Sequence, residues 1–85
     1  MKYDLLSVKT ALEVLYAQGY TEIRTHYFLY LFCEKYGVDM ERENRRIRGM
    51  LDLLGRKGKI RLENDGESIV LENMLTSNLR LIINR

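Results

Sequence analysis

The 85-residue sequence contains no proline, one cysteine and one histidine. A single cysteine cannot form an internal disulfide, which agrees with a reducing compartment. Cys33 and His26 are seven residues apart, about 10 Å along a helix, so one metal ion cannot bind both directly. No second cysteine or histidine, Ser-His-Asp set or phosphate-binding glycine loop occurs. The sequence therefore predicts no metal site, no cofactor and no enzymatic activity.

The chain also lacks any run of 18 or more apolar residues, so no transmembrane helix is expected. Asp4, Lys9 and Glu13 interrupt the N-terminal apolar residues and argue against a secretory signal. We therefore expect a cytoplasmic protein. The length fits one domain over residues 1–85 with one small core, formed by about residues 5–72.

Three segments have apolar residues at helical spacing. They predict helices over residues 3–18, over about 21–36 with Thr21 as the N-cap, and over 39–56 with Asp39 as the N-cap. The last helix should bury Ile47, Leu51 and Leu54 and expose its arginines. Residues 73–85 fit either a helix or a strand, and we favour a helix.

A β-hairpin is predicted around Asp65-Gly66, which separates two β-rich runs and is typical of a type I′ turn. The expected register pairs Leu62 with Ile69 and Arg61 with Val70, and a shift by one residue would mix apolar and polar faces. The predicted fold is therefore mainly α with a small hairpin, an α+β domain.

Basic residues are concentrated in one part of the chain. Residues 42–61 contain eight basic and two acidic residues, a net charge of +6, whereas the remainder carries six basic and ten acidic residues, a net charge of −4. Such a local basic block is typical of a nucleic-acid-binding surface. The overall net charge of +2 conceals it.

The segment "LDLLGRKGKI" resembles the junction between recognition helix and wing in the winged helix-turn-helix superfamily. Leu51, Leu54, Gly58 and Ile60 match its L-x-x-L-x-x-x-G-x-I pattern. The resemblance covers about residues 5–72. It implies three helices, a two-stranded wing and DNA binding, here with a C-terminal helix expected after the wing.

The resemblance further implies that the helix over residues 39–56 enters the DNA major groove. Its outer residues Arg42, Arg45, Arg46 and Gly49 would then approach bases and phosphates. Phosphate contacts are expected from Arg48, Arg56, Lys57, Lys59 and Arg61. Gly49 also favours an interface, because a glycine inside a helix costs about 0.8–1 kcal/mol of stability relative to alanine. Core packing does not explain a glycine on the outer face of the helix.

Other interpretations remain open. The arginines could form an ordinary solvated face, with Glu41–Arg45 and Glu43–Arg46 ion pairs along the helix. The acidic wing tip, residues 63–67, is unlike a phosphate-binding wing and favours a winged-helix module that binds other proteins. Double-stranded RNA is a minor third option.

The favoured function is a homodimeric transcription regulator that binds double-stranded DNA sequence-specifically. The apolar surface of the first helix and of residues 73–85 exceeds what one small core can cover. A homodimer through these two segments is therefore expected.

Overall fold

The computed structural model describes residues 2–71, which form three helices and a three-stranded antiparallel sheet with strand order β1-β3-β2. The fold is therefore α+β, as expected. The predicted helix or dimerisation segment over residues 73–85 lies outside the described residues. In chain order the elements are α1 (Leu5–Ala17), β1 (Glu22–Arg24), α2 (Thr25–Tyr36), α3 (Met40–Arg56), β2 (Arg61–Glu63) and β3 (Ser68–Val70).

The two-stranded wing expected from the sequence is wrong, because β1 adds a third strand. β1 pairs with β3 in the register Glu22↔Val70, Ile23↔Ile69. The predicted helix start at Thr21 is wrong for the same reason: α2 begins at Thr25, after Arg24 as the N-cap residue. Pairing with β1 provides hydrogen-bond partners for the backbone groups on the second edge of β3. Within β1, Ile23 is buried and its two neighbours are exposed.

The predicted hairpin register is confirmed, because β2 and β3 pair Arg61 with Val70 and Leu62 with Ile69. Residues 64–67 form the turn between the strands: the amide of Glu67 donates to the carbonyl of Asn64 over 3.0 Å, and that of Gly66 to Glu63 over 3.1 Å. Asp65 and Gly66 have φ angles of 58° and 85°, the positive values that a type I′ turn requires, and Asn64 before them is also left-handed, with a φ of 54°.

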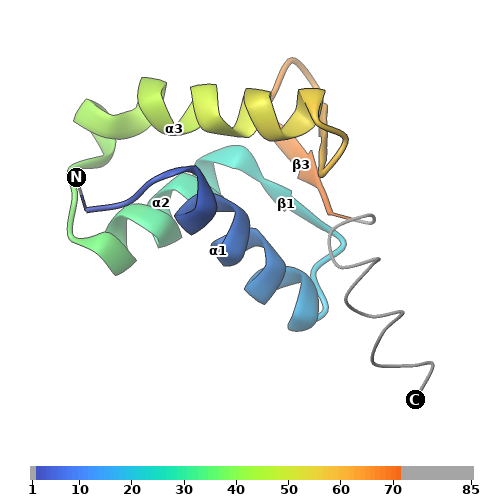
Figure 1. The fold of residues 1–85 in the computed structure, drawn as a ribbon, viewed down its shortest axis with the longest axis horizontal. Helices are drawn as coiled ribbons and strands as arrows, with labels where there is room; N and C mark the ends of the chain where they lie inside the picture. Colours follow the sequence, from blue (N-terminus) through green and yellow to red (C-terminus); the bar gives the residue numbers. More distant parts are fainter. Residues whose placement is uncertain (1, 72–85) are drawn as a thin grey trace.

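The core lies between the sheet and the three helices, and α3 contacts α1, α2 and β2 (Figure 1). Its buried side chains come from every element, including Leu12 of α1, Phe28 of α2 and Ile69 of β3. Ile47, Leu51 and Leu54 form the inner stripe of α3 and are at most 2% exposed, as predicted. Because this stripe is fixed to the core, the opposite face of α3 must project outward.

The end of α3 has the hydrogen bonds of a Schellman motif. Lys59 donates its amide to the carbonyl of Leu54 over 3.0 Å, and Gly58 donates to Gly55 over 3.1 Å. The φ angle of +75° at Gly58 is the left-handed conformation that this ending requires. The chain then turns so that Ile60 is buried before β2 begins.

Thr25 connects the start of α2 to the hairpin turn. Its side chain is 1% exposed, and its hydroxyl donates to the carbonyl of Gly66 over 2.6 Å. Its amide donates to the carbonyl of Glu67 over 2.9 Å. These two bonds hold the turn beside the body of the domain.

Replacing Thr25 with valine should lower the free energy of unfolding by about 1–3 kcal/mol, because valine keeps the shape but leaves the Gly66 carbonyl without its donor. Urea unfolding would measure the change. Thr10→Val, at an exposed position of α1, is the matched control and should change stability by less than about 0.5 kcal/mol. Equal effects of the two substitutions would show that the Thr25 hydroxyl does not stabilise the turn.

Candidate nucleic-acid interface

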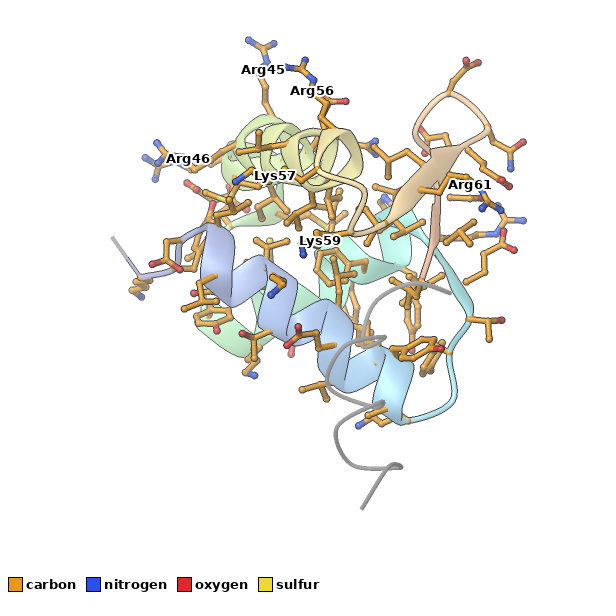
Figure 2. The ribbon with its side chains drawn as sticks, turned by 45° about the vertical axis from the view of Figure 1, so that its right-hand side comes forward. Arg45, Arg46, Arg56, Lys57, Lys59 and Arg61 are labelled. Carbon is orange, nitrogen blue, oxygen red and sulfur yellow. The ribbon has the colours of Figure 1, made fainter. Side chains whose placement is uncertain are left out.

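The outward face of α3 forms a ridge that we define as Arg42, Arg45, Gly49 and Arg56. All four residues are exposed and lie opposite the buried inner stripe. Arg45 and Arg56 project from α3 in the same direction, away from the rest of the domain (Figure 2). The ridge therefore gathers four of the nine residues that the sequence predicted to bind DNA.

The two arginines in the N-terminal half of the ridge are free to bind a ligand. Neither Arg42 nor Arg45 forms an ion pair with any residue between 2 and 71, so the predicted Glu41–Arg45 pair is absent. The third ridge cation differs, because Nη2 of Arg56 lies 2.9 Å from Oδ2 of Asp52. The ridge arginines without an ion pair among residues 2–71 therefore lie near the start of α3, where Asp39, Glu41 and Glu43 are also located.

Arg46 and Arg48 lie on the two flanks of α3. The predicted pair between Arg46 and Glu43 is present, with Nε of Arg46 3.6 Å from Oε1 of Glu43. Nε of Arg48 donates to Oδ1 of Asn44 over 2.7 Å, and Nη1 lies 3.6 Å from Oε2 of Glu67 in the hairpin turn. The Arg48 guanidinium thus faces the hairpin and not the ridge.

The remaining predicted contacts follow α3 along the chain. Lys57 and Lys59 are exposed and form no ion pair within the described part of the chain. Arg61 on β2 points away from α3 (Figure 2), and its Nε lies 2.8 Å from Oε2 of Glu63. The structure therefore does not bring Arg61 together with the ridge.

Gly49 borders a groove between α3 and the hairpin turn, with a volume of about 320 Å³. A Cβ atom at Gly49 would meet no heavy atom within 4 Å, so the fold itself does not require glycine here. The groove also contains Arg48, Asp52 and Asp65. Glu67, the ion-pair partner of Arg48, adds a third carboxylate beside it. This charge balance favours an approach to Gly49 along the ridge over entry of a phosphate into the groove.

Tyr3 fixes the N-terminal half of α3 to the start of the chain. Its ring is 4% exposed and packs edge-on against Phe32, with ring centroids 5.2 Å apart. Its hydroxyl donates to Oε1 of Glu43, the carboxylate that pairs with Arg46. Burial, and then this hydrogen bond, raise the pKa of Tyr3 above its ordinary value. The phenol therefore stays neutral and positions Glu43.

Three further residues position this surface, and none was predicted from the sequence to do so: Tyr3, Asn44 and Thr25. Tyr3 and Thr25 bind residues 40 and 41 positions away, so no local pattern indicates their partners. The contact of Asn44 could have been predicted, because residues four apart on a helix, such as Asn44 and Arg48, lie on the same face.

The other reactive side chains do not form a second site in the described residues. Cys33 is buried, and burial followed by the charges of Glu43 and Asp39 raises its thiol pKa. His26 is exposed at the start of α2. Between residues 2 and 71 no three histidine, cysteine, aspartate or glutamate side chains are grouped to hold a metal ion, and no helix is long and apolar enough to cross a membrane.

Replacing Gly49 with alanine should raise the free energy of unfolding by about 0.5–1 kcal/mol, because alanine favours the helix and its Cβ meets open space. Gly55→Ala is the matched control in the same helix, where the new Cβ would lie in ordinary contact, 3.8 Å from the Leu62 side chain. Both variants should be stabilised in urea unfolding. Destabilisation by Gly49→Ala alone would show that the fold needs this glycine.

Comparison with known proteins assigns no family to this arrangement. No protein-family model, curated protein or solved structure matched the chain. The candidate interface therefore depends on the chain's own residues: a core-anchored helix, a ridge with two arginines that form no ion pair within residues 2–71, and an acidic hairpin turn beside it.

Proposed function

We propose that this chain binds double-stranded DNA and presents the ridge of α3 to the major groove. The observation that carries the proposal is the exposure of Arg42 and Arg45 without a carboxylate partner among residues 2–71, on a helix whose opposite face is buried. The major groove is about 12 Å wide and admits an α-helix. Arginine is the commonest side chain that reads guanine there.

The connection between α2 and α3 supports a helix-turn-helix arrangement. Only Gly37, Val38 and Asp39 separate the two helices, and Gly37 is left-handed with a φ of 64°. Short turns that contain glycine are typical of this motif, whose second helix is the DNA-reading one. The packing at Leu51, Leu54, Gly58 and Ile60 also agrees with the winged-helix resemblance.

The ion pairs of the arginines guide our choice among the proposed DNA contacts. We assign base reading to Arg42 and Arg45 and phosphate binding to Lys57 and Lys59. Arg46 and Arg56 would have to exchange Glu43 and Asp52 for phosphate. Arg48 and Arg61 are weaker candidates, since both pair with acids of the hairpin.

A sequence-specific transcription regulator in the cytoplasm is the function that best fits this surface, and a homodimer is its proposed form. Leu6 and Val14 on α1 are 66% and 45% exposed, which leaves apolar surface for a second copy. The dimer would use α1 and residues 73–85. Two copies would place two α3 helices on half-sites about 34 Å apart.

A protein-binding module is the second candidate function. It is favoured by Tyr27 and Tyr30, which are 47% and 51% exposed on α2, since tyrosine is enriched at protein interfaces. The acidic hairpin turn fits the same alternative. Purified protein that carries a protein partner and no nucleic acid would favour this second function.

The ridge can be tested with random duplex DNA at low and moderate salt. We expect binding at micromolar protein that weakens steeply with salt. On the sequence selected from the random pool, the double variant Arg42→Ala, Arg45→Ala should bind at least about tenfold more weakly, since a good bidentate contact contributes about 1–3 kcal/mol of discrimination for its base.

A control for this test removes the same charge elsewhere. Arg24→Ala with Lys2→Ala changes two exposed cations, on β1 and just before α1, and should retain most of the affinity. No duplex binding at micromolar protein, or equal losses in the two double variants, would refute the assignment of α3. Selection of bound sequences from the random pool would reveal a palindrome if two copies bind together.

The acidic turn should weaken duplex binding in the wild-type chain. Glu67→Gln removes the carboxylate beside Arg48, so Arg48 becomes available to a phosphate. We expect a several-fold gain in affinity and a salt slope steeper by about 0.9. Glu22→Gln, at an exposed carboxylate of β1 that is the ion-pair partner of neither Arg48 nor Arg61, is the control and should change the slope less. An unchanged slope in Glu67→Gln would show that Arg48 takes no part in binding.

A further inference from the structure

An apolar groove opens between α1 and α2. The residues that line it include Val14 and Leu15 of α1 and Phe28, Leu31 and Phe32 of α2. Phe28 and Phe32 are at most 2% exposed and form the floor, whereas Val14 on the rim is 45% exposed. The groove is thus an open extension of the core surface.

The groove has the size of a site for one inserted apolar side chain. Its volume is about 160 Å³. A cavity of about 150 Å³ lined by aliphatic and aromatic side chains holds a benzene-sized group. Gln18 and Lys35 are the polar residues at its edge. A leucine or isoleucine with polar neighbours would therefore match both the hollow and its rim.

The chain has a segment of this chemistry directly after Leu71 in the sequence. Residues 72–85 include six apolar side chains, which are Met74, Leu75, Leu79, Leu81, Ile82 and Ile83. The segment follows Leu71, whose amide donates to the carbonyl of Thr21 over 2.8 Å. Thr21 is three residues beyond Gln18 on the groove edge, so the segment starts near the mouth of the groove.

A second copy is the better source of this segment than the same chain. β3 and α1 end on the same side of the domain (Figure 1). A segment that entered its own groove would have to reverse direction soon after Leu71, where Asn73 is the nearest residue typical of turns and no glycine or proline follows.

The exposed apolar surface of α1 also favours a second copy as the source of the segment. Leu6 is 66% exposed and does not line the groove, so a segment inserted from the same chain would leave it uncovered. A second copy that also packs its α1 against this α1 would cover both Leu6 and the groove. In a two-fold dimer each contact is made twice, so one small hollow per copy contributes two insertions.

We propose that residues 72–85 of one copy insert an apolar side chain into the α1–α2 groove of a second copy, and that the exchange is reciprocal. The proposal rests on the homodimer part of the proposed function and names the surface that forms it. It does not depend on DNA.

Cross-linking of the full-length chain tests the exchange. One preparation carries Gln18→Cys at the groove edge and another carries Ser77→Cys, and the two are mixed and treated with a short bis-maleimide. We expect a mixed dimer, identified by mass, in higher yield than with Glu34→Cys, an exposed control position on α2 that does not line this groove. The native Cys33 is buried, and unsubstituted protein corrects for its reaction.

A second measurement uses a charge in the groove. Val14→Asp should weaken dimerisation in analytical ultracentrifugation at least tenfold, whereas Leu53→Asp, at an exposed aliphatic residue of α3 outside the groove, should have a smaller effect. Circular dichroism would check that both variants fold. Equal effects of the two variants would count against the groove.

Three results would overturn the exchange. They are a mixed-dimer yield no higher than the control, a monomer at all concentrations, or only intrachain products from a chain with both Gln18→Cys and Ser77→Cys. A chain that binds duplex DNA but fails to cross-link refutes the exchange alone. A chain that cross-links but binds no duplex refutes the DNA-binding function alone.

Discussion

The pairing of β3 with both of its neighbours is the interaction on which the rest of the structure depends. β3 joins β1, from the first third of the chain, to β2, which follows α3. The same pairing places the hairpin turn over Thr25, where two hydrogen bonds hold it. The turn then brings Glu67 to Arg48, so the electrostatics of one flank of α3 follow from the sheet.

Local patterns predicted much of this fold. The inner stripe of α3, its ending at Gly58 and the register of β2 on β3 all depend on residues close in sequence, and periodicity or turn chemistry reveals such features. The strand β1 was missed because three residues of alternating exposure are a weak signal beside an apolar helix. The segment "TEIRT" does alternate polar residues around Ile23, which was the available indication.

The candidate site was predictable as a set of basic residues but not as a surface. Sequence spacing indicated correctly that Arg42, Arg45 and Arg56 share a face of α3. It could not indicate that Arg48 turns to Glu67, because that contact depends on where the hairpin lies. Of the two ion pairs expected within α3, Glu43–Arg46 is present and Glu41–Arg45 is absent. An exposed ion pair contributes only about 0–1 kcal/mol, so small differences in free energy decide whether a solvated side chain binds a partner or water.

The position of β3 also has a consequence for how the chain acquires its structure. Ile69 and Leu71 are fully buried in the same cluster as Leu12 and Phe28, yet they lie more than 40 residues beyond them. During synthesis the helices can form from local contacts, but β1 lacks its pairing strand until residues 68–70 leave the ribosome. Closure of the core is therefore a late step, because pairing of β1 with β3 closes the long loop of chain between them. Until then the nascent chain exposes the apolar faces of its helices.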